Sequence, residues 1–262
     1  MVLDRFSLEG KAAIVTGAGR GIGKGIALAF ADAGADVVCV ARTHSEIEAT
    51  AAEIRGLGRK SLAISCDVGD EEQVETMVAK TIEEFGGIDV LVNNAGGGIY
   101  RSFLRLSLRA FESTLRTNLV SVFLCTRAVA RHMVERKAGS IVNVSTRDAI
   151  IPCPGLSAYG AAKAGVNSLT RTLAWELAPY VRVNSIMPGG VLTEGSTAVL
   201  EPVKDRLVAG TPRGRMGKPE DIALAAIFLA SSASEWVTGR MFEIDGGIEF
   251  VHLEPGDLAG PQ

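Results

Sequence analysis

Short apolar runs recur along the chain and are rich in valine and isoleucine. Most of them do not alternate with polar residues, which indicates burial on both faces. Strands buried on both faces are typical of a parallel sheet. The pattern predicts seven strands, at residues 12–16, 37–41, 62–66, 90–93, 141–145, 181–187 and 241–244.

Longer stretches with apolar residues at helical spacing separate these runs. Examples lie at residues 46–57, 71–85, 111–136 and 159–177. Strand and helix therefore alternate throughout, which predicts an α/β fold with a doubly wound sheet of about seven parallel strands and helices on both faces. Neither a linker nor a repeat is visible, and we expect residues 1–262 to form a single domain.

Two segments depart from this alternation. Residues 189–219 follow the sixth strand and are rich in glycine, proline, threonine and charge. They lie near the carboxyl ends of the strands, where open α/β sheets bind ligands, so we interpret them as a substrate lid rather than an ordinary surface excursion. Residues 248–262 form a tail longer than the fold needs. Phe250, Val251 and Leu253 would cover a pocket there, although a frayed terminus is the stronger expectation.

Charge and composition argue against several partners. The net charge of −3 leaves no basic field for nucleic acid or an anionic membrane. No apolar run reaches the roughly 18 residues of a membrane span, and the acidic N-terminal segment does not resemble a signal peptide. The cysteines and histidines lack the spacing of metal ligands, so we expect no metal and reduced thiols in a cytoplasmic protein.

The first predicted strand runs directly into a glycine-rich segment, T-G-A-G-R-G-I-G at 16–23, and a helix follows. Glycines let the backbone approach a pyrophosphate, and the free N–H groups of the helix N-terminus then bind it. The spacing is G-x-x-x-G-x-G rather than G-x-G-x-x-G, but its place between strand and helix favours a dinucleotide site over a merely tight turn. The candidate cofactor-binding residues are Gly17, Gly19, Arg20, Gly21, Ile22 and Gly23.

The end of the second strand bears on which dinucleotide is bound. An acid there would bind the ribose 2′-hydroxyl of NAD, but the sequence has Arg42 and Thr43 instead. Arginine suits the 2′-phosphate of NADP, and Arg20 adds a second positive charge. We therefore favour NADP(H), with NAD(H) as the alternative in which Arg42 is a solvated charge. After the third strand, Asp67 and Val68 are expected at the adenine, unless Asp67 caps the next helix.

Five features together resemble the short-chain dehydrogenase/reductase family: the glycine segment at 16–23, N-N-A-G at 93–96, Asn118, Y-G-A-A-K at 159–163, and P-G-G-V-L-T at 188–193. They follow the family's order and spacing from about residue 7 to 250. The resemblance implies an NAD(P)-dependent oxidoreductase with a Rossmann-like fold, assembled as a homotetramer or dimer through the helices at 111–136 and 159–177. It also implies cofactor contacts by Asn94, Ala95, Gly96, Tyr159, Lys163, Pro188, Gly189, Val191 and Thr193.

The chemistry of such an enzyme needs a proton donor at the carbonyl oxygen. Tyr159 can serve if its pKa, ordinarily about 10, is lowered towards neutrality. Lys163 lies one helical turn later on the same face, and its ammonium charge favours tyrosinate. The resemblance implies that Lys163 also holds the nicotinamide ribose, and that Asn118 bends its helix and holds a water leading to the lysine. The alternative is a buried Asn118 that satisfies backbone groups.

The family's fourth catalytic residue is a serine thirteen positions before the tyrosine, and that position is Thr146 in this chain. Threonine keeps a hydroxyl that can bond the substrate oxygen and adds a methyl group. Because neighbouring side chains of a strand point to opposite faces, Ser145 should face away from the site. We therefore predict that Thr146, and not Ser145, does the serine's work.

The substrate pocket is expected between residues 97–101, 147–156 and 190–218. The middle segment contributes apolar side chains, which predicts a bulky, largely hydrophobic alcohol or ketone. Within the family, three passages resemble hydroxysteroid dehydrogenase-like members: N-N-A-G-G-G, P-G-G-V-L-T and the segment at 211–229.

Other substrates and roles stay open. A 3-oxoacyl-carrier-protein reductase would dock an acidic carrier through basic residues, of which Lys137 is present while Tyr180 occupies the other place. A sugar or polyol dehydrogenase would use Arg147 and Asp148 to bind a polar group, although pairing with surface neighbours is the stronger expectation for them. A non-catalytic NADP-binding sensor would predict a damaged tyrosine–lysine pair, and that pair is intact.

Overall fold

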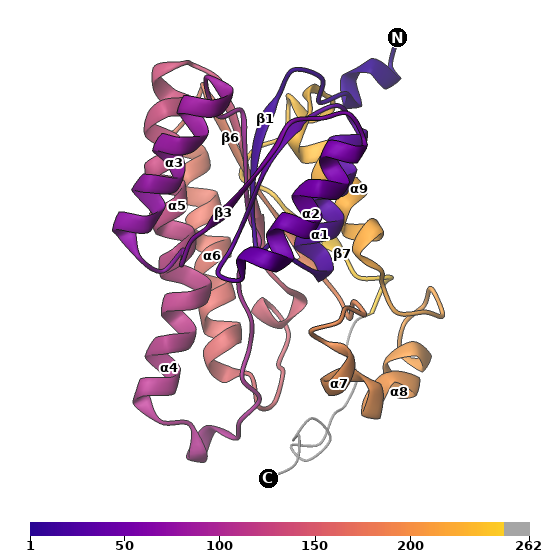
Figure 1. Ribbon diagram of the computed structural model, residues 1–262. Coiled ribbons are helices and arrows are strands. Elements are labelled where there is room, and N and C mark those ends of the chain that lie inside the picture. Colours follow the sequence, from indigo (N-terminus) through magenta and orange to yellow (C-terminus); the bar gives the residue numbers. More distant parts are fainter. Residues whose placement is uncertain (249–262) are drawn as a thin grey trace.

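The computed structural model describes residues 1–248, and in that part of the chain seven parallel strands form one sheet with helices on both faces (Figure 1). The strands lie in the order β3-β2-β1-β4-β5-β6-β7. They are β1 Ala12–Thr16, β2 Asp36–Ala41, β3 Ser61–Ser65, β4 Val90–Asn93, β5 Gly139–Val144, β6 Val181–Pro188 and β7 Met241–Ile244. The predicted doubly wound α/β fold is therefore confirmed.

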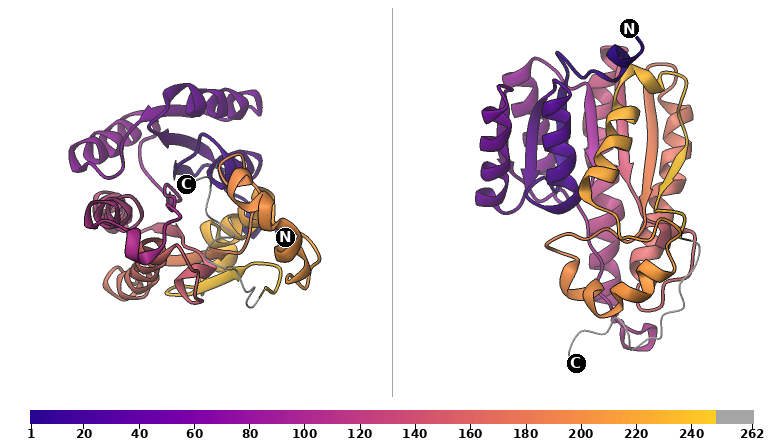
Figure 2. Two further views of the ribbon diagram at one scale, coloured as in Figure 1. Left: turned by 90° about the horizontal axis from the view of Figure 1, so that it is seen from below. Right: turned by 90° about the vertical axis from the view of Figure 1, so that its right-hand side faces the viewer.

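The two faces of the sheet carry separate hydrophobic cores, because successive side chains of each strand point to opposite faces. Ala13 and Val15 of β1 pack under α1 Gly21–Asp32, α2 His44–Gly56 and α9 Pro219–Ala230. Ile14, between them, packs on the other face under α3 Glu71–Phe85, α5 Ser121–Glu135 and α6 Ser157–Glu176. The views of Figure 2 show the two helical layers with the sheet between them.

One predicted helix is interrupted. The stretch 111–136 reads as a single helix in the sequence, but the structure divides it into α4 Leu108–Leu115, a π-helical turn at Arg116–Val120, and α5. Asn118 lies in the turn, fully buried, and its side chain donates to the carbonyl of Thr114 four residues earlier (2.9 Å). A π-helical turn inside an α-helix is frequently found at a functional site.

The order of the strands places several loops at one point. β1 pairs in parallel with β2 on one side and with β4 on the other, so the strands that follow β3 in the chain are added on the opposite side of β1. The carboxyl ends of parallel strands meet at one edge, and a ligand crevice forms at such a switch point. The glycine segment after β1, residues 94–97 after β4, residues 145–149 after β5 and residues 189–193 after β6 all leave from this edge.

The segment 189–219 contains two short helices, α7 Thr197–Leu200 and α8 Lys204–Ala209. Its apolar side chains form a small cluster of their own, in which Val203, Leu207 and Met216 pack with Ile248 and with Tyr100 from the loop after β4. The expectation for Phe250, Val251 and Leu253 of the tail lies outside the described residues. No helix of residues 1–248 is long and apolar enough to cross a membrane.

Candidate active site

The glycine segment forms a tight turn in which side chains are excluded. Gly17 has a φ of +68°, and a Cβ on it would lie 2.8 Å from the side-chain nitrogen of Asn94. A Cβ on Gly23 would lie 2.1 Å from the carbonyl oxygen of Gly17. Both positions therefore require glycine, one for its backbone conformation and both for space. The turn brings the N-terminus of α1, which begins at Gly21, to the edge of the sheet.

An anion already sits at that N-terminus. The N–H of Gly21 donates to a carboxylate oxygen of Glu194, from the segment after β6, at 3.1 Å. The first N–H groups of a helix have no partner within the helix and attract negative charge. The Glu194 carboxylate is thus the acceptor for one N–H group at the start of α1. Glu194 was not among the residues singled out from the sequence.

Thr16 fastens the N-N-A-G segment to the glycine turn, a role that the sequence analysis missed. Its buried hydroxyl donates to the carbonyl of Val92 (3.1 Å) and accepts from the N–H groups of Asn94 and Ala95 (3.0 Å each). The Asn94 side chain in turn donates to the Thr16 carbonyl (2.9 Å). The two candidate cofactor loops therefore form one rigid unit. The signal was present in the T-G-A-G motif, whose threonine is the strand's last residue.

Two arginines stand near the turn. Gly17 donates its N–H to the carbonyl of Val40 (2.7 Å), which joins the turn to the end of β2 just before Arg42. Arg20 and Arg42 are both exposed, and neither forms an ion pair with another of residues 1–248. Glu46 of α2 packs against Gly19, so one carboxylate shares this region. Thr43 precedes α2 and is exposed.

Asp67 does not cap the following helix. That role belongs to Asp70, whose side chain accepts from the N–H of Gln73 (3.1 Å) at the start of α3. The Asp67 carboxylate instead accepts from the N–H of Gly69 (2.9 Å) and stays exposed, while Val68 is buried. The structure therefore leaves the Asp67 side chain at the surface beside the ends of β2 and β3.

Both polar atoms of the Asn118 side-chain amide hydrogen-bond the backbone of Gly97, in the loop after β4. Its oxygen accepts from the N–H of Gly97 (3.0 Å) and its nitrogen donates to the carbonyl of Gly97 (2.9 Å). A Cβ on Gly96 would lie 2.5 Å from the Asn118 oxygen and 3.5 Å from the ammonium nitrogen of Lys163. The structure therefore brings Asn118, Gly96 and Lys163 together. Asn118 is buried and its side chain bonds backbone groups, which is the alternative role considered for it from the sequence.

Lys163 is a buried ammonium group beneath the site. Its nitrogen donates to the carbonyl of Val144 at the end of β5 (2.7 Å) and lies 5.7 Å from the centre of the Tyr159 ring. Burial lowers the pKa of Lys163 to about 8, because the charged form loses its hydration.

The two neighbouring hydroxyls point apart, although both lie just beyond β5, which ends at Val144, and not within the predicted strand at 141–145. Ser145 donates to the carbonyl of Lys163 (3.2 Å) and is buried under α6. Thr146 lies within 3.3 Å of a carboxylate oxygen of Asp148 and accepts from the Asp148 N–H (3.3 Å). It also hydrogen-bonds Tyr159, which works against the rise of that residue's pKa. The structure therefore joins Thr146, and not Ser145, to the tyrosine.

The pKa of Tyr159 was expected to fall towards neutrality, but the groups of the protein around it raise it instead. Burial raises the Tyr159 pKa, since the phenolate loses its hydration, and the negative charge of Asp148 raises it further. The hydrogen bond from Thr146 opposes this rise without cancelling it. The sequence analysis considered the lysine charge but not the carboxylate two residues after Thr146.

Arg147 and Asp148 do not act as a pair. Arg147 forms ion pairs with Glu243 and Asp245 at the end of β7, the latter at 3.0 Å, and donates to the carbonyl of Ile248 (2.8 Å). The expectation that Arg147 pairs with neighbours is thus met. Asp148 turns the other way, towards Thr146 and Cys153.

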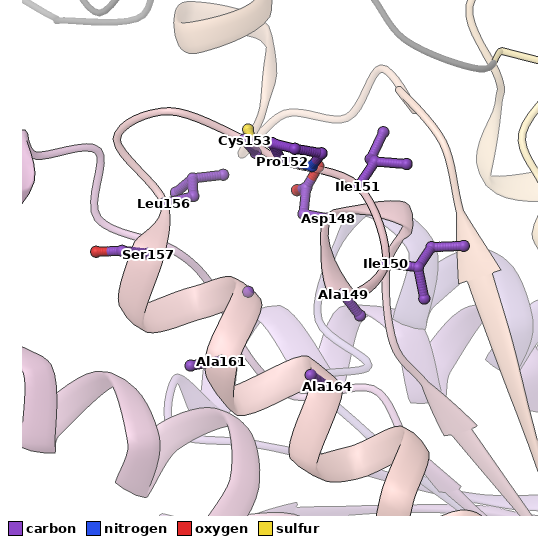
Figure 3. Close-up of a pocket in the computed structure, with 11 residues that line it drawn as sticks. Asp148, Ala149, Ile150, Ile151, Pro152, Cys153, Leu156, Ser157, Ala161 and Ala164 are labelled. Atoms are coloured by element: carbon purple, nitrogen blue, oxygen red, sulfur yellow. The ribbon is translucent and has the colours of Figure 1, made fainter.

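A pocket of about 390 Å³ opens beside these residues (Figure 3). Ile150, Ile151, Pro152 and Leu156 supply apolar lining, and Asp148 is its charged residue. The opposite wall is the face of α6 that carries Ala161 and Ala164. This pocket differs from the expected one, because residues 97–101 and 190–218 do not line it.

The first residues of the segment 189–219 reach back to the glycine turn. Gly189 donates to the carbonyl of Ile244 (3.2 Å) after Pro188 ends β6, and Val191 is buried. Thr193 accepts from the N–H of Ser196 (3.1 Å), and its side chain lies against Gly21. The predicted contact residues after β6 therefore lie at the same end of α1 as Glu194.

Known proteins resemble the chain over nearly its whole length. A family model described as enoyl-(acyl carrier protein) reductase matches residues 17–249. A 3-oxoacyl-[acyl-carrier-protein] reductase of Thermotoga maritima is 38% identical and covers 92% of this chain and 98% of its own. The structure of a 7α-hydroxysteroid dehydrogenase with NADH and 7-oxo glycochenodeoxycholic acid superposes with a TM-score of 0.92 at 35% identity, covering 95% of this chain and 99% of its own. A gluconate 5-dehydrogenase of Burkholderia cenocepacia, in complex with NADP and tartrate, superposes with a TM-score of 0.91 at 35% identity, covering 95% and 98%.

Proposed function

Because the chain belongs to the short-chain dehydrogenase/reductase family and is an NAD(P)-dependent oxidoreductase of alcohols, we propose that its substrate is a bulky, largely hydrophobic secondary alcohol or the matching ketone. The observation that carries this proposal is the meeting of Thr146, Tyr159 and Lys163 just beyond the end of β5, together with the apolar side chains Ile150, Ile151 and Pro152 of the loop that follows Thr146. The relative bound to 7-oxo glycochenodeoxycholic acid supports a substrate of that size.

Three side chains carry the proton transfer. Tyr159 gives its proton to the carbonyl oxygen during reduction and takes the alcohol proton during oxidation. Thr146 holds that oxygen through its hydroxyl, in the place where charge develops. The buried ammonium of Lys163 lies under the Tyr159 ring and stabilises the tyrosinate electrostatically. Asn118 keeps the loop at Gly97 against this group, so that it acts as a positioning residue.

The dinucleotide, when bound, supplies or takes up the hydride. The residues present fit it: the glycine turn excludes side chains, and its N–H groups already hold a carboxylate. Its pyrophosphate would lie at the start of α1, and its nicotinamide end would lie against the loops after β4, β5 and β6. The residues that would hold it are Gly17, Gly19, Arg20, Gly21, Ile22, Gly23, Asn94, Ala95, Gly96, Tyr159, Lys163, Pro188, Gly189, Val191 and Thr193.

NADP(H) is the proposed preference over NAD(H). Arg20 and Arg42 are exposed cations with no ion-pair partner in the described chain; Arg42 follows the end of β2, and Arg20 lies in the glycine turn itself. Guanidinium groups bind phosphate with forked, charge-assisted hydrogen bonds. Two carboxylates also lie at this turn, Glu46 against Gly19 and Glu194 at the Gly21 N–H, so the preference rests on the two guanidinium groups being able to bind the 2′-phosphate directly.

The proposal is tested by following reduced-cofactor absorbance with a panel of bulky cyclic ketones and alcohols, with NADPH and NADH in parallel. We expect turnover of several members, and we expect Tyr159→Phe to lower kcat by roughly 10²- to 10⁴-fold. Tyr180→Phe is the matched control, because Tyr180 directly precedes β6, at the amino ends of the strands and therefore at the opposite edge of the sheet from these groups. Tight NADPH binding without turnover of any compound would favour the sensor instead.

A further inference from the structure

Asp148 is a carboxyl group at the centre of the reacting site that the proposed proton transfer does not use. It lies two residues after Thr146, and one of its carboxylate oxygens is 3.3 Å from the Thr146 hydroxyl. Cys153 hydrogen-bonds it, and Tyr100 and Tyr159 are close enough to feel its charge. Figure 3 shows its carboxyl group beside Pro152 and Cys153 on the pocket wall.

Within residues 1–248 this carboxyl group has no cationic partner. Arg147, its neighbour in the chain, is directed to Glu243 and Asp245 on the far side of the loop. Burial without a counter-charge raises the pKa of Asp148. A half-buried carboxylate keeps acceptor capacity on both oxygens, and Thr146 and Cys153 occupy only part of it.

The distance between the Thr146 hydroxyl and the Asp148 carboxylate limits which substrates can contact both groups. The oxygen of the reacting carbon sits at the Thr146 hydroxyl in the proposed reaction. The Thr146 hydroxyl donates to a carboxylate oxygen of Asp148 at 3.3 Å, so the two groups can contact neighbouring atoms of one small molecule. A second hydroxyl on the neighbouring carbon can therefore donate to Asp148 while the first is held by Thr146. A substrate carboxylate or phosphate in the same place would be repelled.

We propose that Asp148 is a specificity-determining residue that accepts a hydrogen bond from a hydroxyl on the carbon next to the reacting carbon, so that the preferred substrates are vicinal diols and α-hydroxy ketones. This inference rests on the proposed alcohol–ketone interconversion. In oxidation, the reacting carbon loses a hydride to the oxidised nicotinamide cofactor, and its O–H loses a proton to Tyr159. The products are an α-hydroxy ketone, the reduced cofactor and one proton, and the second hydroxyl is unchanged.

The test compares substrates that share one carbon skeleton. The kcat/KM of the whole enzyme is measured for cyclohexanone against 2-hydroxycyclohexanone, and for cyclohexanol against 1,2-cyclohexanediol, with NADP(H) and NAD(H). We expect the hydroxylated compound of each pair to be preferred by about tenfold to a hundredfold, the range for a hydrogen bond to a charged group. Asp148→Ala should bring the preference to within about threefold while plain cyclohexanone is still reduced. Asp148→Asn, which keeps one acceptor oxygen, should fall between the two.

The outcomes separate the inference from the function on which it rests. Equal or weaker activity on the hydroxylated compounds with the unmodified enzyme would overturn the role of Asp148 without any variant. If the Asp148 variants lose kcat/KM equally for both compounds of each pair, the proposed role in specificity is also overturned, since Asp148 would then only position Thr146. Better turnover of 2-aminocyclohexanol than of the diol would overturn the preference for a hydroxyl, because Asp148 would then bind a substrate ammonium group more favourably. No turnover of these compounds or of the bulky ketones and alcohols of the first panel would overturn the proposed function itself.

Discussion

Replacing Thr146 with valine removes a hydroxyl at almost constant shape, and this makes it the sharpest perturbation of the proposed site. A single hydrogen-bond donor to an oxygen that gains charge in the transition state contributes about 2.7–4 kcal/mol, or roughly 10²- to 10³-fold in kcat. Thr146→Val should therefore lower kcat by that factor. Thr146→Ser keeps the hydroxyl and should stay within about threefold of the unmodified enzyme.

The structure also bounds the cost in stability. The N–H of Asp148 loses its acceptor on Thr146, at 3.3 Å, which costs about 1–3 kcal/mol when the group stays buried. That is less than the 5–15 kcal/mol by which domains are ordinarily stable, so the variant should fold. Ser145→Ala is the matched control, since it loses one buried hydrogen bond, to the Lys163 carbonyl, at about 1 kcal/mol. Its kcat should change little.

The assay is steady-state reduction of an accepted ketone, with thermal unfolding measured on each variant. A large kcat loss in Ser145→Ala and a small one in Thr146→Val would refute the assignment. Equal losses in Thr146→Val and Thr146→Ser would show that the methyl group or the packing, rather than the hydroxyl, decides the rate.

Three further perturbations test other parts of the site. Arg42→Ala should lower kcat/KM for NADP(H) by about tenfold or more and leave the value for NAD(H) within about threefold, because only the former has a 2′-phosphate; equal losses would contradict this. Glu194→Gln removes the negative charge at the Gly21 N–H, so fluorescence titration should show NADPH binding about two- to fivefold tighter, while unchanged or weaker binding would count against it. Asp148 raises the Tyr159 pKa, so Asp148→Asn should lower it and move the corresponding limb of the kcat/KM–pH profile to lower pH. A limb that stays in place or moves upward would argue against that influence.

Much of the fold was predictable because its signals are local. The bounds of β1 and β4 coincide with the apolar runs at 12–16 and 90–93, since a strand buried on both faces needs an unbroken apolar stretch. The bounds of β7 at 241–244 were also predicted, although this edge strand is only partly buried. The thirteen-residue spacing to Tyr159 singled out Thr146. Ser145 is directed to the Lys163 carbonyl, but both residues lie beyond the end of β5, so the strand alternation used in the prediction does not extend to them. The prediction of one continuous helix at 111–136 was wrong. The apolar spacing continues through the π-helical turn that contains Asn118, so the sequence pattern does not reveal the interruption.

Long-range contacts decided the rest. The amino-acid order alone specified the strands, the glycine turn and the spacing of Tyr159 and Lys163, because each depends on neighbours within a few residues. Tertiary structure alone separated Arg147, held by β7, from Asp148, which turns into the site, and set Glu194 on the N-terminus of α1. It also raised the Tyr159 pKa where the lysine spacing suggested a fall. Burial and through-space charge depend on every segment that packs around a group, and those segments are far apart in the chain.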